Sequence, residues 1–271
     1  MQYQLFLSEH PQAEYLLLSS GLGGHGQYWA PQITALQQYF HVVIYDQEGC
    51  HKTSEILDAD YSMRHLAEQV LHLLHILNIQ QFHFIGHALG GLIGAELAVL
   101  LEKTEKSMLS LTIVNGWQHL DAHTHKCFNA RIALLQYAGA EAYVRAQALF
   151  LYPPAWISAQ IAAIEIQENK QLMQFPPLLN VFTRLKALMS YQLSDETLLS
   201  LGKIPVYLIA TEDDFLVPYQ QSYFLKQVLP HADLEILPRG GHALTVTIPD
   251  EFNQLILGKL VHFKCMQRAV G

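Results

Sequence analysis

The sequence predicts an α/β protein whose sheet is mostly parallel and doubly wound, with a helical cap inserted between two of the strands. Three observations lead to this prediction. Apolar runs of strand length alternate with segments of helical periodicity, glycine-rich turns follow several runs, and one long central segment has helical patterns without a convincing strand. Strands that are apolar along their length are typical of a parallel sheet covered on both faces. Their alternation with helices produces the doubly wound arrangement.

The expected strands are short and mostly apolar. They span residues 15–18, 42–45, 82–85, 111–114, 206–210 and 234–237. Between them, residues 61–78 carry an apolar stripe at helical spacing. Residues 92–101 are apolar on nearly every side, so this second helix should be buried. Pro249 and the two acidic residues after it suit the first turn of a last helix.

Residues 118–202 interrupt the alternation, because they show helical patterns but no convincing strand. The proline pairs at 153–154 and 176–177 should break helices or mark their first turns. We interpret this segment as a helical cap, which leaves residues 1–117 and 203–271 as the α/β core. A chain of 271 residues is long enough for one large domain with such an insertion.

The composition limits the expected partners and compartment. The formal net charge is −8 and no Lys/Arg-rich run occurs, so we expect no nucleic-acid partner, because phosphate binding needs a basic face. Cys50, Cys127 and Cys265 are widely spaced and form no C-x-x-C pair, which argues against a disulfide framework or a thiolate zinc site. The sequence shows neither a signal-peptide pattern nor a membrane-spanning run. We expect a cytoplasmic monomer or homodimer that acts on a small molecule, with no membrane partner.

Two turns at predicted strand ends are candidates for a binding site, since ligands of open α/β sheets lie beyond the carboxyl ends of the strands. Residues 86–90 read GHALG, and their small side chains suit a sharp turn from strand to helix around Ala88. The N–H of Leu89 should lie at a helix N-terminus, where partial positive charge gathers. Together with the N–H of Leu22, in the glycine-rich turn 20–24, it would form an oxyanion hole. Each turn also has a purely structural interpretation, as a tight glycine turn.

An acid and a histidine follow two later strands. Asp214, in the segment ATEDDFLVP, is the acid that we expect to orient an imidazole and stabilise its charge. His242, which follows the glycines of RGGH, is a candidate general base near neutral pH. Turn or capping acids, and a surface histidine in a chain with 15 histidines, are the alternative interpretations.

Positions 88, 214 and 242 follow the order of nucleophile, acid and base in the α/β-hydrolase superfamily, and the sequence resembles that superfamily along essentially its whole length. The resemblance is closer still to the RutD-type hydrolases of bacterial pyrimidine utilisation. It is carried by the stretches SGLGGHGQYW, YDQEG, GHALGGLIG, VNGW, AHTHKCF, LFLYP, FLVP and GGHA. The sequence departs from the wider superfamily at Glu48 and His51, where arginine and glycine are frequent, and at Ser20, where histidine is common.

The resemblance implies an α/β-hydrolase fold and hydrolysis of a small product of uracil breakdown. The substrate is either carbamate, which gives ammonia and carbon dioxide, or aminoacrylate, which gives malonic semialdehyde. Ala88 has no hydroxyl group, which excludes covalent catalysis by a serine. We therefore expect His242, oriented by Asp214, to take a proton from water. Arg131, in the predicted cap, is a candidate for charge-assisted hydrogen bonds to an anionic substrate, with a surface arginine as the alternative.

Other interpretations stay open at this point. Residues 123–127, HTHKC, offer side chains of the metal-ligand type, but without further ligands we expect neither a metal ion nor a cofactor. The chain as a whole is also compatible with a non-catalytic binding module on a hydrolase scaffold, although the retained Asp214 and His242 argue against it. Cofactor-free oxygen chemistry on an activated aromatic substrate, and an engineered replacement of serine by Ala88, are the remaining alternatives.

Overall fold

A seven-stranded sheet forms the centre of the molecule in the computed structural model, which describes residues 2–270 and their side chains as far as residue 261. The strand order is β1-β3-β2-β4-β5-β6-β7, and every neighbouring pair is parallel except β1 with β3. The six predicted strands are all present, so the mostly parallel sheet is confirmed. The strands are β1 (Tyr3–Phe6), β2 (Tyr15–Ser19), β3 (His41–Tyr45), β4 (Gln81–His87), β5 (Ser107–Val114), β6 (Val206–Thr211) and β7 (Asp233–Leu237).

β1 falls outside the predicted set. It is an antiparallel edge strand that pairs with β3, with Tyr3 opposite Tyr45. Three of its four residues are exposed, so it lacks the continuous apolar run by which the buried strands are predicted. Its pairing depends on a partner some 40 residues later in the chain, which local sequence does not reveal.

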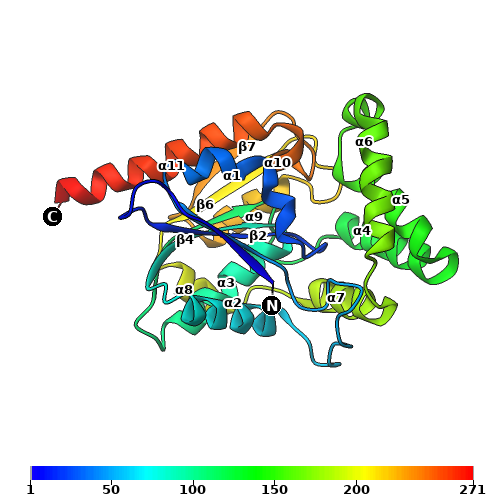
Figure 1. Cartoon of the computed structure of the whole chain (residues 1–271), viewed down its shortest axis with the longest axis horizontal. Coiled ribbons are helices and arrows are strands. Elements are labelled where there is room, and N and C mark those ends of the chain that lie inside the picture. Colours follow the sequence, from blue (N-terminus) through cyan, green and yellow to red (C-terminus); the bar gives the residue numbers. More distant parts are fainter. Residues whose placement is uncertain (1, 271) are drawn as a thin grey trace.

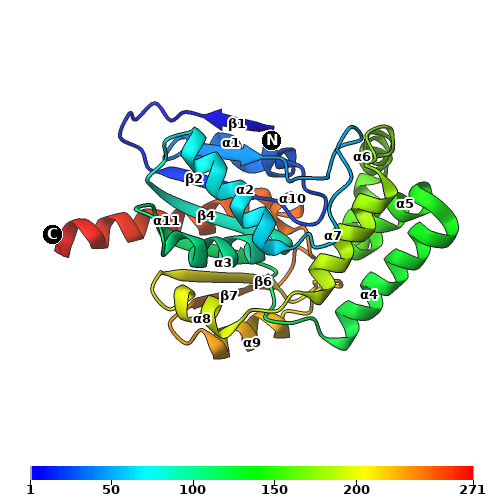
Figure 2. The ribbon, with the colours of Figure 1, turned by 90° about the horizontal axis from the view of Figure 1, so that it is seen from below.

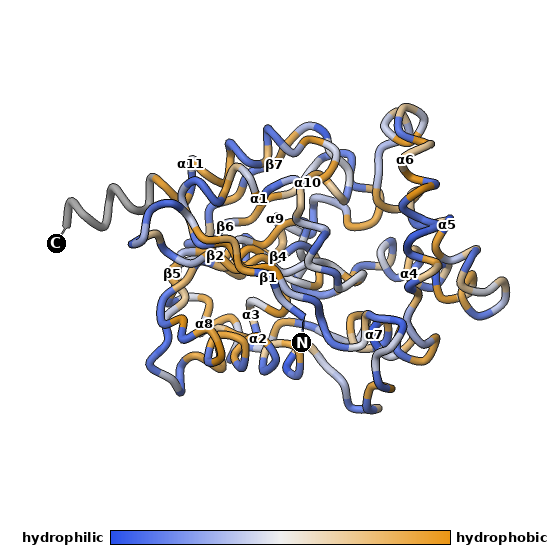
Figure 3. Tube along the Cα trace, in the orientation of Figure 1, coloured by the Kyte–Doolittle hydropathy of each residue, from blue (hydrophilic) through white to orange (hydrophobic). Residues whose placement is uncertain are grey.

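Helices cover both faces of the sheet (Figure 1). Along β2, the side chain of Leu17 packs into the core on one face, while Leu16 and Leu18 pack into the core on the other. This alternation explains why the strands are apolar throughout, and Figure 3 shows the hydrophobic colour along the central strands. One face carries α2 (Met63–Ile76), α3 (Leu89–Leu101) and α8 (Asp195–Leu201), the other carries α1 (Ala30–Gln37), α10 (Leu244–Thr247) and α11 (Pro249–Val270), and α9 (Gln220–Val228) packs against β6 and β7.

α3 is buried over almost its whole surface, as its composition predicts, because it lies between the sheet, α2 and α8. Glu96 is the single charged residue of this helix. Its carboxylate forms an ion pair with Arg64 at 3.1 Å and accepts a hydrogen bond from the Tyr191 hydroxyl at 2.8 Å. These partners compensate for the loss of water around the buried charge.

The segment between β5 and β6 contains helices and no strand (Figure 2). Four long helices gather at one end of the molecule: α4 (Ala122–Ala133), α5 (Gly139–Leu151), α6 (Pro154–Met173) and α7 (Leu178–Ser190). α6 begins at Pro154 and α7 directly after Pro177, because proline suits a first helical turn. α8 also belongs to the predicted cap range 118–202, yet it packs against α3. The division into a core and a cap at these boundaries stays a prediction.

None of the helices described in residues 2–270 is both long enough and apolar enough to cross a membrane.

Candidate active site

A cavity of about 610 Å³ lies between the loops at the carboxyl ends of the strands and the helices after β5. Of the residues predicted to form a site, it is lined by Leu22, Ala88, Leu89, Arg131 and His242. Asp214 is buried behind His242 rather than on the cavity wall. The structure therefore brings together all six residues, which span 220 positions of the sequence.

The corner at Ala88 is built by close backbone contacts. An added Cβ at Gly86 would lie 2.2 Å from the carbonyl carbon of Gly90, so no other residue fits without displacing the turn. Ala88 itself has φ 48° and ψ −112°, a backbone conformation that is unfavourable for a residue with a Cβ. A hydrogen bond from the Ala88 N–H to the Val114 carbonyl, at 2.7 Å, holds this conformation. Leu89 begins α3, so its N–H has no acceptor one turn earlier in the helix.

His242 and Asp214 form a buried pair. The Nδ1 atom of His242 lies 2.8 Å from Oδ2 of Asp214. The other carboxylate oxygen accepts hydrogen bonds from the backbone N–H groups of Leu216 and Val217, at 2.8 and 2.9 Å. Because the carboxylate accepts the Nδ1 proton, Nε2 keeps the lone pair that a general base needs.

The backbone of the loop that carries His242 is fixed from several sides. The His242 carbonyl accepts hydrogen bonds from Nε2 of His87 at 2.8 Å and from Nδ2 of Asn115 at 2.7 Å. At the end of α5, the Leu151 carbonyl accepts a hydrogen bond from the N–H of Ala243 at 3.0 Å. Gly241 has φ 64°, and an added Cβ there would lie 2.8 Å from Cδ of Pro153. The glycine before the histidine is thus required both by its conformation and by the close approach of Pro153.

His87 is the residue at the elbow to which the sequence assigned no role. Its ring is buried, lies 4.7 Å from the ring of His242 and stacks on Tyr28 at 4.9 Å. Burial, together with a smaller effect of the neighbouring His242, lowers the pKa of His87 to about 3, against an opposing effect of the hydrogen bond to the His242 carbonyl. His87 is therefore neutral at physiological pH and places no positive charge beside the candidate base.

Arg131 is not a surface arginine, since it is only 4% exposed. Its Nη2 donates to the Tyr143 hydroxyl at 3.1 Å, and its guanidinium carbon lies 5.3–5.9 Å from the ring centres of Phe128, Tyr143 and Phe150. Its Nε is buried without a hydrogen-bond partner within the described part of the chain. A buried donor with no acceptor is costly, and Arg131 lines the cavity, so an anion bound there would satisfy it.

Arg184 of α7 also reaches the loops of the sheet, and sequence patterns give no sign of it. It donates from Nη1 to the Glu48 carbonyl at 2.6 Å, and from Nη2 to the Leu22 carbonyl at 3.0 Å and to Oε1 of Gln47 at 2.6 Å. These three partners lie more than 130 residues earlier in the chain. Arg184 thereby fastens the turn that carries Leu22 to α7.

Side chains of the metal-ligand type form a group outside residues 123–127, the segment that the sequence suggested. In residues 123–127, Nε2 of His123 lies 2.6 Å from the Phe215 carbonyl and 3.5 Å from Sγ of Cys127, and no third ligand joins them among the described residues. A group of three is instead formed by His25, Cys50 and His51.

The comparison with known proteins decides the family. A model of the alpha/beta hydrolase fold family matches residues 15–247. This chain is a member of the α/β-hydrolase family. The predicted fold and the resemblance on which it rested are thus confirmed.

Two relatives of this hydrolase carry the name "Putative carbamate hydrolase RutD". The one from Acinetobacter baylyi is 56% identical over 257 residues, which are 95% of this chain and 97% of the relative. The one from Pseudomonas syringae pv. syringae is 44% identical over 256 residues, or 94% and 97%. Among solved structures, the enol-lactonase from Burkholderia xenovorans LB400 has a TM-score of 0.82 at 22% identity and covers 96% of each chain. That last likeness shows the shared fold alone.

Proposed function

We propose that this α/β hydrolase breaks the C–N bond of a small product of pyrimidine breakdown, either carbamate or aminoacrylate, with a water molecule that His242 activates. The names of the relatives, at 56% and 44% identity over almost the whole chain, support carbamate. The resemblance of motifs such as GHALGG, VNGW and LFLYP to RutD-type hydrolases supports the role in pyrimidine breakdown.

The observation that carries the proposal is the buried His242–Asp214 pair beside a corner that has no nucleophile. The histidine lines the same cavity as Ala88, and its Nδ1 is engaged by Asp214 at 2.8 Å. A methyl group at position 88 leaves room for a water molecule where a serine hydroxyl would stand. A positioned general base contributes about 10²–10⁴-fold to a reaction rate.

In both substrates His242 takes a proton from water while the water oxygen bonds to the carbon that carries nitrogen. With carbamate, the C–N bond then breaks and the nitrogen takes the proton from His242, which gives ammonia and bicarbonate, the hydrated form of carbon dioxide. With aminoacrylate, the proton is returned to the carbon next to the carboxylate, and the carbinolamine formed then transfers its hydroxyl proton to nitrogen and loses ammonia to give malonic semialdehyde. The N–H groups of Leu22 and Leu89 would stabilise negative charge that develops on a carbamate oxygen. Carbamate and enamines already decompose in water, so a modest acceleration is sufficient.

Both proposed substrates are carboxylates, and Arg131 is the cavity residue suited to bind them. Within the described part of the chain, its Nε has no hydrogen-bond partner and its Nη2 donates to Tyr143, so the guanidinium has donors to offer a carboxylate. The cavity of about 610 Å³ is much larger than a molecule of carbamate. We therefore expect the substrate to occupy only the part of the cavity between Arg131 and His242.

The direct test follows ammonia release from fresh carbamate, and from aminoacrylate generated in place, at controlled pH. The wild type should accelerate release, and His242→Ala should remove the acceleration. His72→Gln, which replaces an exposed histidine on α2, is the matched control and should behave as the wild type. Equal rates with wild type, with His242→Ala and without protein would sink the proposal.

A second experiment separates the enzyme from a non-catalytic binding module. Ala88→Ser restores a hydroxyl at the corner, and an aligned His242 should make it reactive towards a fluorophosphonate. The wild type should not be labelled at position 88. If Ala88→Ser is not labelled either, His242 is not aligned with the corner, and the binding-module alternative gains support.

A further inference from the structure

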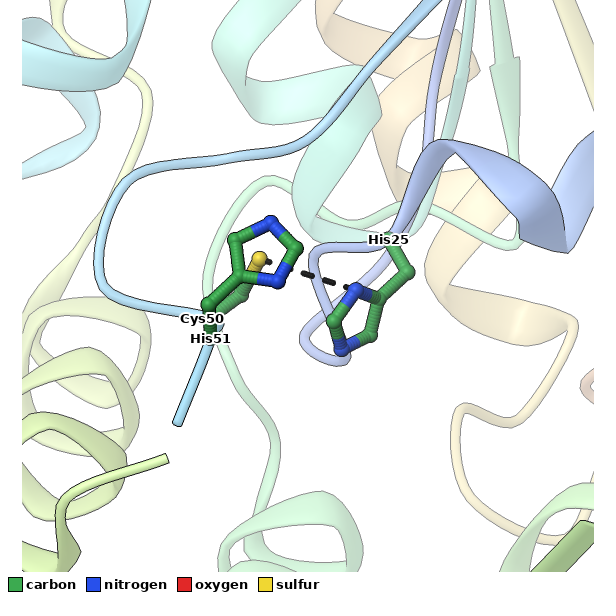
Figure 4. A group of neighbouring side chains, drawn as sticks. All are labelled: His25, Cys50 and His51. Carbon is green, nitrogen blue, oxygen red and sulfur yellow. Dashed lines mark hydrogen bonds between the residues drawn. The ribbon is translucent and has the colours of Figure 1, made fainter. Parts of the chain in front are cut away.

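A second group of chemically active side chains lies at the wall of the same cavity, away from His242. His25 follows β2, while Cys50 and His51 follow β3. Each offers one ligand atom, and these atoms all lie within 4.8 Å of one another. Figure 4 shows the His51 ring beside the Cys50 sulfur, with the His25 ring opposite and a dashed line from the sulfur to Nδ1 of His25. The loops that carry them meet because β2 and β3 are neighbours in the sheet.

The spacing of the ligand atoms is close to that of a tetrahedral metal site. Nδ1 of His25 lies 3.8 Å from Sγ of Cys50. A zinc ion with usual bond lengths places a histidine nitrogen and a cysteine sulfur about 3.6 Å apart. The ring centres of His25 and His51 are 5.1 Å apart, with an interplanar angle of 71°, so the rings do not stack and block the space between them. No pair of ligand atoms has to approach by more than about 1.5 Å to reach tetrahedral spacing.

His51 has the outer partner that metal-bound histidines usually have. Its Nε2 lies 2.9 Å from Oδ2 of Asp46, at ion-pair distance but without the alignment of a hydrogen bond. A rotation of the imidazole ring would align the two groups and leave Nδ1 for a metal ion. The other oxygen of Asp46 accepts a hydrogen bond from the Gly26 N–H at 2.7 Å, so the carboxylate is itself held in place. A carboxylate on the second ring nitrogen fixes the tautomer of a metal-binding histidine and raises its basicity.

The two loops are held together independently of any ion. The N–H of Gln47 donates to the Gly24 carbonyl at 2.8 Å. Gly24 has φ 82°, and an added Cβ there would lie 2.7 Å from Cβ of Cys50, so the backbone passes directly beside the thiol. The ligand-bearing segments are therefore positioned before a metal ion arrives.

The charged groups around the three side chains are of both signs. The Asp46 carboxylate lies beside His51, and the guanidinium of Arg184 lies near the Cys50 thiol, because both approach Gly24. A metal-bound thiolate would pair this guanidinium with a negative charge.

We propose that His25, Cys50 and His51 bind one zinc ion, or a similar borderline divalent cation, and that the fourth coordination position opens to the substrate cavity. Two histidines and one cysteine are a ligand set for zinc-like ions. His25 and His51 line the same cavity as His242, so water or a carboxylate oxygen from the cavity can complete the coordination. This revises the expectation from sequence that the chain binds no metal. The proposal does not rest on the proposed hydrolysis, because it concerns binding alone.

Cobalt(II) is the probe of choice, because a cobalt–thiolate bond absorbs in the near ultraviolet and a cobalt–histidine bond alone does not. The full chain is prepared without a histidine tag, stripped with a chelator and titrated with Co²⁺. We expect a charge-transfer band that saturates at one equivalent and disappears when Zn²⁺ is added. The readout matters because the chain has 15 histidines, so total metal content would not identify the site.

The variants assign the band to this group. Cys50→Ser should abolish it, while His25→Asn and His51→Asn, which keep the thiol, should weaken Co²⁺ binding at least tenfold. Cys127→Ser is the matched control, since Cys127 lies beside His123 but has no third ligand among the described residues, and it should leave the band intact. Asp46→Asn keeps an oxygen that accepts from the Gly26 N–H but removes the negative charge beside His51. It should weaken Co²⁺ binding about 10–100-fold.

The outcome is decisive in both directions. The proposal is overturned if the wild type gives no thiolate band at millimolar Co²⁺, or if Cys50→Ser gives the same band as the wild type. Far-ultraviolet circular dichroism and melting in excess chelator establish that each variant is folded. If Cys50→Ser does not fold, the test depends on His25→Asn and His51→Asn. An unchanged Co²⁺ affinity in both of these variants overturns the proposal.

Discussion

Two histidine–carboxylate pairs each present a histidine to the cavity, and their surroundings differ. His242 and Asp214 are almost completely buried, whereas the side chains of His51 and Asp46 are 28% and 18% exposed. The carboxylate of the first pair is held by two backbone N–H groups and its histidine by a neutral neighbour, His87. The second pair instead lies beside a thiol and another histidine.

The environment of a histidine–carboxylate pair therefore decides whether it is suited to proton transfer or to cation binding. A buried imidazole that faces a cavity through a single nitrogen is suited to move a proton. An imidazole with neighbouring nitrogen and sulfur ligands is suited to hold a cation. The four predictions below test this division, and the first concerns the pair with the largest expected effect.

Asp214→Asn should reduce kcat/KM for C–N hydrolysis by about 10²–10⁴-fold, because the amide neither stabilises a charged imidazole nor fixes its tautomer. Steady-state ammonia release measures the effect. Glu212→Gln removes an exposed carboxylate two residues away and should change kcat/KM less than twofold. Similar losses in the two variants would contradict a special role for the buried pair.

Arg131→Met should raise KM for a carboxylate substrate about 10- to 100-fold, since a hydrogen bond to a charged group contributes about 1.5–3 kcal/mol. The value of kcat should change much less. Arg145→Met is the control, because Arg145 is an exposed arginine of the same group of helices, paired with Glu141. An unchanged KM in Arg131→Met would place the substrate anion elsewhere, for example beside the second pair.

His87 should make the stability of the fold depend on pH. Its folded pKa of about 3 lies below the unfolded value of 6.5, so the unfolded chain takes up a proton first as pH falls. The stability that His87 provides is complete above pH 6.5 and is lost below it, by about 2 kcal/mol between pH 7 and pH 5.

Urea unfolding of the wild type and His87→Gln at both pH values measures this dependence. Between pH 7 and pH 5, the free energy of unfolding should fall by about 2 kcal/mol less in His87→Gln than in the wild type. His72→Gln should show the same fall as the wild type. Parallel curves for wild type and His87→Gln would mean that His87 is protonated in the folded state.

Asp46→Asn should lower the free energy of unfolding of the metal-free protein by less than about 1 kcal/mol, because partly exposed ion pairs contribute little. The asparagine oxygen still accepts from Gly26, as Oδ1 of Asp46 does. Chemical denaturation in excess chelator measures the change. A loss of several kcal/mol would show that the second pair is a structural element rather than a binding site.

Much of the fold was accessible from local sequence. The parallel strands are apolar because both faces of the sheet are covered, and Pro154 marks the start of a helix because its ring suits the first turn. The edge strand β1 was not accessible, because exposed residues paired at a distance carry no such pattern.

The candidate site divides in the same way. The order of Ala88, Asp214 and His242 along the chain was informative because it reflects the order of the strands. Arg184 and the group of His25 with Cys50 depend on contacts between loops that are distant in sequence, so no spacing rule finds them. The sequence offered one sign of this group: Cys50 and His51 are adjacent residues of the metal-ligand type, and position 51 is often glycine in the wider superfamily.

The hydrogen bond from Ala243 to the Leu151 carbonyl ties the loop of the base to the end of α5. The ring of Pro153 rests against Gly241, one residue before that base. Any outward swing of these helices must therefore disturb the loop beside the imidazole. The position of His242 is therefore coupled to the position of α5, so a substitution that displaces the end of this helix should also displace the imidazole.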